Sequence, residues 1–147
     1  MTQPLTKDRQ TWMSVLAKAN PGRLAQLLPA LPDHRLLRAP EVGAVMVRGR
    51  IGGTGEAFNL GEMTVTRASV QLSTGPVGHA WVQGRDKAHA TRAAIVDALM
   101  QTDAAPETGA AIVDVLAKEA AVAIATRAAR AATTKVDFFT LVRGEDT

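Results

Sequence analysis

The sequence predicts an α+β fold, in which an antiparallel sheet of about four to five strands packs with N-terminal and C-terminal helices. Helical periodicity is confined to about residues 8–29 and 86–132, while residues from about 34 to 83 alternate between apolar and polar side chains. Helices and strands that are segregated along the chain in this way are typical of α+β domains. The length of 147 residues also leads us to expect a single domain over 1–147.

The N-terminal segment predicts two helices. In residues 8–19 four apolar side chains recur at helical spacing: Trp12, Val15, Leu16 and Ala19. Asn20 before Pro21 predicts the end of this helix, because the residue before a proline disfavours helical backbone. A second short helix, "GRLAQLL", is expected to run to Pro29, and the first extended segment, "HRLLRA", follows Pro32.

The middle of the chain predicts strands. Residues 42–51 alternate, with Val45, Val47 and Ile51 on one face and Met46, Arg48 and Arg50 on the other. In residues 62–72 the apolar parity changes between Val65 and Ala68, which predicts a bulge at Arg67–Ala68. Arg67 would then either be re-aimed toward a functional site or be a structural arginine satisfied by loop carbonyls. Residues 73–76 predict a turn, and 77–83 the returning strand of a hairpin.

The C-terminal part predicts helices followed by a docking segment. Asp86 is the expected N-cap of a helix, and a long alanine-rich helix should cover roughly residues 110–132. Residues 135–143 contain "VDFFTLV", which predicts a strand that is apolar on both faces. Such a strand is either central in its own sheet or covered by another protein. The partner-docking candidates are Phe138, Phe139, Leu141 and Arg143.

Composition narrows the function class. The formal net charge is only +3 and aromatic residues make up 3% of the chain, which weighs against a nucleic-acid reader that stacks bases on aromatic side chains. The absence of cysteine excludes a disulfide, a thiolate metal site and an iron–sulfur cluster held by this chain. We see neither a secretory signal nor a membrane-spanning segment, and therefore expect a cytoplasmic protein with no membrane attachment.

The stretch "RIGGTGEAFNLG" over residues 50–61 suggests a phosphate cradle but matches neither common motif. A P-loop requires Gly-Lys-Ser/Thr and a following helix, and the dinucleotide pattern G-x-G-x-x-G is absent. One reading is a loop whose glycines supply positive φ; the other is an anion nest, favoured by an expected loop length of about ten residues. The candidate contacts to an anion or an interface are Arg48, Arg50, Gly52, Gly53 and Gly55.

The helix after Asp86 carries two basic residues on its apolar side. His89 and Arg92 fall inside the apolar stripe, whereas Lys87, Asp97 and Gln101 are expected to face the other way. His89 and Arg92 either contact an anion in a cleft or subunit seam, or form an internal ion pair with Glu56, Glu62 or Asp137. Arg85 is a further candidate contact, and His89 is the one candidate acid or base.

No self-contained active site is visible in the sequence. The three histidines, His34, His79 and His89, lack metal-ligand spacing, so no metal site is expected. A nucleophile elbow and an outstanding pair of carboxylates are also missing. An interaction subunit therefore ranks above a free-standing enzyme.

Four long strings resemble the PhnG family of the bacterial carbon–phosphorus lyase system: "RQTWMSVLAKA", "RGRIGGTGEAFNLGEMTVTRASVQL", "GHAWVQGRDKAHATRAAIVDALM" and "KVDFFTLVRGED". The resemblance covers most of the chain and includes both ends. It implies a role in phosphonate catabolism. In that system the G, H and I subunits, with an ATPase-like L subunit, transfer the ribose 5-triphosphate of ATP to an alkylphosphonate and release adenine.

The resemblance also implies the partners and cofactors. H, I and J subunits would be partners in a twofold core complex with two copies of this chain, I and J directly, and the ATPase-like K and L subunits indirectly. ATP would be a substrate of the complex, while the iron–sulfur cluster and S-adenosylmethionine would belong to the J subunit. The chain would be part of a transferase without being catalytic alone. The alternative is a free-standing anion- or nucleic-acid-binding module built on Arg48, Arg50, Arg67 and Arg92.

Overall fold

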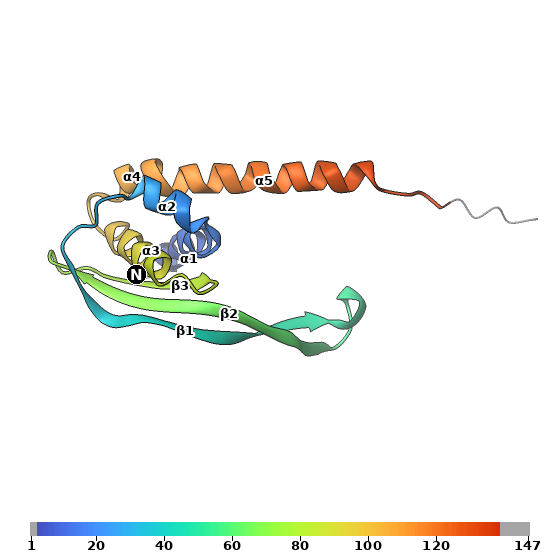
Figure 1. Cartoon of the computed structure of the whole chain (residues 1–147), viewed down its shortest axis with the longest axis horizontal. Coiled ribbons are helices and arrows are strands. Elements are labelled where there is room, and N and C mark those ends of the chain that lie inside the picture. The colour runs from blue at the N-terminus through green and yellow to red at the C-terminus, as the bar shows by residue number, and fades with distance from the viewer. Residues whose placement is uncertain (1–2, 139–147) are drawn as a thin grey trace, which may run out of the picture.

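The computed structural model describes residues 3–138, with side chains from residue 8 onward. The chain is α+β, as expected, and its helices lie on one side of an antiparallel sheet (Figure 1). The elements in chain order are α1 (Gln3–Lys18), α2 (Pro21–Leu27), β1 (His34–Arg50), a 3-10 turn (Ile51–Gly53), β2 (Ala57–Leu72), β3 (Val77–Gln83), α3 (Lys87–Leu99), α4 (Ala105–Thr108), a π-helical turn (Gly109–Val113) and α5 (Asp114–Thr133).

The sheet has three strands in the described residues, in the order β1-β2-β3, and not the expected four to five. The segment "HRLLRA" and the strand expected at 42–51 are parts of one strand, β1, which continues through Pro40. A proline lacks the N–H that a central strand needs, but it is tolerated on an edge strand. Because β1 pairs only with β2 among the described strands, it is an edge strand and can continue through Pro40.

The bulge expected at Arg67–Ala68 is not where the irregularity lies. β2 pairs with β3 without interruption from Val65, opposite Gln83, to Gln71, opposite Val77. Two register shifts between β1 and β2 leave extra residues in β1, between Leu36 and Glu41, and a third between Val47 and Arg48 leaves Leu60 of β2 extra. The apolar parity changes in β2 because Val65 is an apolar residue on the face away from the helices.

The core lies between the sheet and α3. Its largest fully buried side chains include Leu16 of α1, Leu24 of α2, Val70 and Val82 of the sheet, and Ile95 of α3. The expected stripe on α1 is confirmed, since Trp12 and Leu16 are buried and Val15 and Ala19 pack at the edge of the same core.

Gly78 in β3 allows α3 to lie directly on the strand. A Cβ at Gly78 would stand 1.9 Å from the carbonyl oxygen of Ala94 and 2.6 Å from the nitrogen of Ala98. No side chain fits at that separation, so the close approach of α3 to the sheet requires glycine here.

Two elements project beyond this core on the same side (Figure 1). We call residues 42–62, the far half of the β1–β2 hairpin, the hairpin arm, and residues 118–133 of α5 the helical arm. Every residue from 118 to 138 is exposed. The residues directly after α5, 135–138, form neither helix nor strand, and the rest of the expected C-terminal strand lies outside the described residues. None of the helices in the described part of the chain is both long and apolar enough to span a membrane.

Candidate functional site

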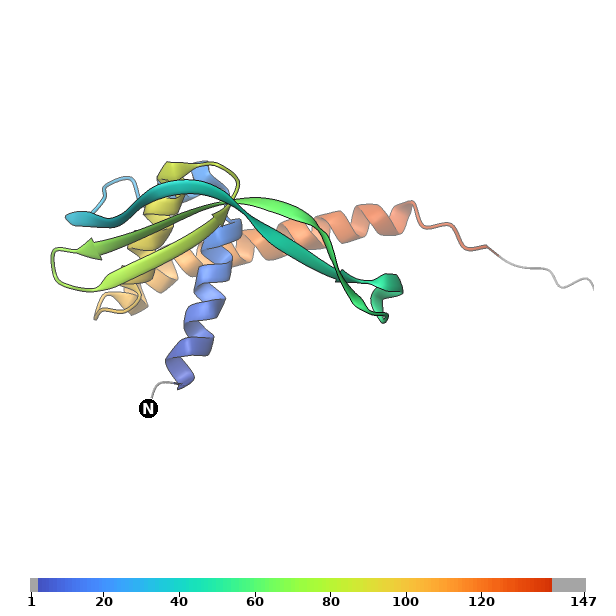
Figure 2. The same cartoon turned by 90° about the horizontal axis from the view of Figure 1, so that it is seen from below.

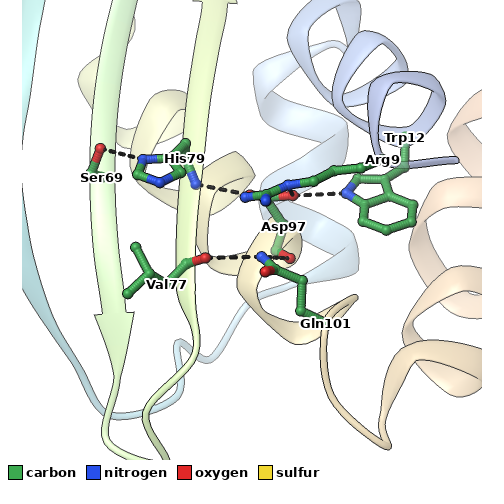
Figure 3. A network of polar contacts seen from close by, with 7 residues as sticks. All are labelled: Arg9, Trp12, Ser69, Val77, His79, Asp97 and Gln101. Atoms are coloured by element: carbon green, nitrogen blue, oxygen red, sulfur yellow. Dashed lines mark hydrogen bonds and ion pairs between the residues drawn. The ribbon is translucent and has the colours of Figure 1, made fainter. Parts of the chain in front are cut away.

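The most connected polar group in the described residues is the carboxylate of Asp97, which α3 holds against α1 and the edge of β3 (Figure 3). Its Oδ1 accepts hydrogen bonds from Arg9 Nε at 3.1 Å and from Trp12 Nε1 at 2.9 Å. Its Oδ2 accepts from Arg9 Nη2 at 2.7 Å and from the backbone N–H of His79 at 2.9 Å. We call these four residues the Asp97 junction.

The Asp97 junction stabilises the fold and is not placed to bind a ligand. Asp97 is 0% exposed, and each of its oxygens already accepts two hydrogen bonds. A carboxylate has about four acceptor positions, so none is left for a ligand. Beside it, Gln101 Nε2 donates to the carbonyl of Val77 at 2.9 Å, which ties the end of α3 to the same edge of β3.

Sequence reasoning missed this junction. Asp97 was expected to face away from the apolar stripe of its helix, and this expectation was wrong because α3 is buried on almost all sides, between the sheet and the other helices. The partners Arg9 and Trp12 lie 88 and 85 residues away, so helical periodicity within α3 could not indicate them.

His89 and Arg92 do lie on the buried side of α3, as expected. His89 is 1% exposed, and its Nε2 donates to the carbonyl oxygen of Leu16 at 2.8 Å. Its Nδ1 and the Nε of Arg92 have no hydrogen-bond partner among the described atoms. Ion pairs of either residue with Glu56, Glu62 or Asp137 are absent from the described residues; instead Asp137 contacts Lys135.

The start of α3 follows the sequence expectation. The Asp86 side chain accepts a hydrogen bond from the backbone N–H of His89 at 2.9 Å and caps the helix. Arg85, one residue earlier, is exposed. A carboxylate that occupies the first free N–H groups leaves no room for an anion directly on this helix end.

The tip of the hairpin arm gathers several residues that the sequence indicated. Arg48, Gly49, Arg50, Gly53 and Ala57 line an open hollow of about 490 Å³. The Arg50 Nη1 donates to the carbonyl of Gly55 at 3.2 Å, which leaves most of its N–H groups available.

The glycines at this tip have different roles. Gly52 and Gly53 have positive φ of 60° and 82°, which confirms the first reading of the glycine stretch for these two positions. Gly55 is required for space instead, since a Cβ there would lie 2.7 Å from the carbonyl of Ile51. The connection between β1 and β2 covers only residues 51–56, so the expected loop of about ten residues was too long.

Arg67 lies on the open face of the sheet, opposite the helices. Its guanidinium contacts the carboxylate of Glu41 and lies over the ring of Trp81, 5.4 Å from the centroid. The hydrogen bond and the charge of Arg67, with a smaller contribution from Arg38, lower the pKa of Glu41 from its ordinary value. The sequence suggested loop carbonyls as partners of a structural Arg67, whereas the partner in the structure is the carboxylate of Glu41. On the same face the Ser69 hydroxyl and His79 Nδ1 are 2.8 Å apart.

Exposed apolar side chains are concentrated on the two arms. Thirteen large hydrophobic residues are exposed in the described part of the chain, and nine of them lie on the arms or directly after α5. They are Val42, Met46, Ile51, Phe58, Leu60, Val122, Ile124, Val136 and Phe138. Phe138, a predicted docking residue, is 91% exposed; Phe139, Leu141 and Arg143 lie outside the described residues. Such a concentration is typical of protein–protein contact surfaces.

Residues 8–138 contain no group of three or more histidine, aspartate or glutamate side chains placed to hold a metal ion.

The chain is similar to known proteins over nearly its whole length. The family model described as "Phosphonate metabolism protein PhnG" matches residues 7–144. A protein of Rhizobium meliloti (strain 1021), described as alpha-D-ribose 1-methylphosphonate 5-triphosphate synthase subunit PhnG, is 48% identical over 142 residues, which are 95% of this chain and 91% of that protein.

Proposed function

Because the chain belongs to the PhnG family of phosphonate metabolism proteins, we propose that it is a subunit of the synthase that makes alpha-D-ribose 1-methylphosphonate 5-triphosphate. The observation that carries the proposal is the 48% identity to a named subunit of that synthase over nearly the whole chain. The reaction transfers ribose 5-triphosphate from ATP to an alkylphosphonate and releases adenine. The chain thereby takes part in phosphonate catabolism.

Within the synthase we propose that this chain contributes through assembly and does not catalyse the reaction alone. Three observations support this role. The carboxylate of Asp97 is saturated by protein donors, and the ring of His89 is enclosed in the core. The arms, by contrast, expose apolar side chains that a free-standing enzyme has no reason to present to water.

We further propose the surroundings of the chain in the cell. Its direct partners are the I and J subunits, with the H subunit in the same twofold core, two copies of this chain per complex, and the K and L subunits attached indirectly. ATP is a substrate of the complex, and the iron–sulfur cluster with S-adenosylmethionine belongs to J. The complex works in the cytoplasm.

The hairpin tip is the part of this chain that we propose reaches a composite site. Arg48 and Arg50 flank the hollow, and the backbone at Gly53 is open toward it. Two arginines beside the backbone of Gly53 suit the triphosphate or phosphonate of the shared reaction, or a carboxylate of a neighbouring subunit. Arg50→Ala should separate these cases: normal assembly with slow adenine release indicates a substrate contact, and lost assembly indicates a subunit contact.

Co-expression with the other synthase subunits tests the proposed function. A tag on this chain should recover the H, I and J subunits, and adenine release from ATP in the presence of methylphosphonate should require the chain. An untagged complex that forms and turns over without this chain would contradict the proposal. If the chain instead binds RNA or DNA with a steep salt dependence and ignores the subunits, the alternative of a free-standing basic module is correct.

A further inference from the structure

We infer that the hairpin arm and the helical arm hold the same partner subunit between them, and that this subunit presents apolar side chains flanked by carboxylates. The inference rests on the proposed function, since it names the surface by which this chain joins the synthase. It concerns residues 42–62 and 118–133, both of which project from the core.

The arms share one direction and leave the space between them open. In Figure 1 they extend to the same side of the core and are separated, and in Figure 2 the hairpin arm crosses the line of α5 at an angle. Every residue of the helical arm is exposed, which means that no described part of this chain fills the space. Isolated helices of this length are marginal in water, so a covering partner would stabilise the arm.

The helical arm turns its positive charge toward this space. Arg127 and Arg130 are the charged residues of 120–133, and they lie within about 40° of Leu116 around the helix axis. Leu116 is buried against the core at the start of α5. Because the hairpin arm lies on the core side of α5, Arg127 and Arg130 point into the space between the arms.

The hairpin arm also carries positive charge. Met46 alternates with Val42 along β1, and Val42 is paired with Thr66 on the helix-covered face of the sheet. Arg48 and Arg50 continue this alternation along β1 beyond the register shift between Val47 and Arg48. Arg48, Arg127 and Arg130 make no ion pair within the described residues, and Arg50 contacts only a carbonyl. The two arms therefore present four arginines that lack a carboxylate partner among the described residues, and carboxylates on a partner would complement this charge.

The size and composition of the surface favour a protein over a small anion. The helical arm has 16 residues and is therefore about 24 Å long, which exceeds the length of a triphosphate. Met46 of the hairpin arm is 53% exposed and offers apolar contact there, and Ile124 of the helical arm, which is 64% exposed, lies about 80° from Leu116 around the helix axis, beside Arg127. Apolar contact with an acidic rim is the chemistry of a protein interface.

Photo-crosslinking in the assembled complex tests whether both arms meet one subunit. Benzoylphenylalanine is placed at Met46 or at Ile124, and at Leu31 as a control, because Leu31 is also exposed but lies outside the arms. Both arm positions should crosslink to the same subunit, while Leu31 should not. Crosslinks to two different subunits, to a second copy of this chain, or to none would overturn the inference.

Charge reversal tests the chemistry of the partner. Arg127→Glu with Arg130→Glu should reduce recovery of that subunit by about tenfold or more, since buried like charges at an interface are strongly unfavourable. The matched variant with lysine at both positions keeps the charge and should retain most of the recovery, and Lys87→Glu on the core should have no effect. Unchanged recovery of the subunit by the double glutamate variant would overturn the inference while leaving the proposed function intact. Failure of the unaltered chain to recover any subunit would overturn both.

Discussion

The guanidinium of Arg9 donates two hydrogen bonds to the carboxylate of Asp97, Nε to Oδ1 at 3.1 Å and Nη2 to Oδ2 at 2.7 Å. The carboxylate is fully buried, whereas the Arg9 side chain is 32% exposed. The pair joins α1 to α3 across 88 residues of sequence, and the backbone N–H of His79 adds the edge of β3. The positions of the first helix, the third helix and the sheet edge therefore depend on one carboxylate.

Replacing Asp97 should cost much of the stability of the chain. Asp97→Ala leaves Arg9, Trp12 Nε1 and the His79 N–H without their acceptor. We expect the free energy of unfolding to fall by about 3–5 kcal/mol, as is typical when one partner of a buried ion pair is removed. Urea denaturation followed by circular dichroism measures the change.

The matched control is Asp103→Ala, which removes an exposed carboxylate between α3 and α4. Its effect should stay within about 0.5 kcal/mol. An equal loss for the two variants would mean that the Asp97 junction does not stabilise the fold.

Gly78 and Gly43 offer a second matched pair. Gly78→Ala places a methyl group against the carbonyl of Ala94 and should destabilise the protein by about 3 kcal/mol or more, because β3 and α3 must separate. At Gly43 a Cβ would meet nothing within 4 Å, so Gly43→Ala should change stability by less than about 0.5 kcal/mol. Thermal unfolding measures both variants. Equal midpoint temperatures for Gly78→Ala and Gly43→Ala would contradict the close packing of α3 on β3.

His89 should matter for stability and not for chemistry. Its ring is enclosed, and its Nε2 donates to the carbonyl of Leu16. His89→Ala should lower the free energy of unfolding by about 1–3 kcal/mol through the lost buried hydrogen bond. Adenine release per assembled complex should be unchanged, and a folded, assembled variant that lost turnover would instead assign His89 to the reaction.

Glu41 should titrate below its ordinary pKa. Arg67 favours the ionised carboxylate by hydrogen bonding and charge, so the pKa of Glu41 in the folded chain lies below the ordinary value of 4.5. The stabilising contribution is therefore present above 4.5 and is lost as the pH falls through the lowered pKa. NMR titration of the Glu41 carboxyl should show this, and Arg67→Met should return the pKa toward 4.5. A wild-type midpoint at or above the ordinary value would contradict the contact.

Much of the local structure could be read from the sequence, because it depends on near neighbours along the chain. The helix over 8–19, the cap at Asp86, the turn at 73–76 and the positive φ of Gly52 and Gly53 were all predicted, and the structure confirms them. So was the family, because long strings of residues carry it. The arginines of the hairpin tip were also selected from their place beside the glycines.

What failed depended on partners far away in the sequence. The extended segment "HRLLRA" and the strand at 42–51 were expected as separate elements, but β1 is an edge strand and continues through Pro40. Val65 suggested a bulge, but it lies on the open face of a regular strand. Asp97 was placed on the outside of its helix, although three distant groups satisfy its charge inside.

The sequence by itself determined the helices and their caps, the turn glycines, the family and the lack of a familiar catalytic motif. Only the tertiary structure decided which carboxylate is buried, which face of the sheet is open, and that residues 42–62 and 118–133 extend from the core to the same side. The physical reason is that capping and turn formation act over a few residues, whereas burial and exposure depend on what the rest of the chain brings near.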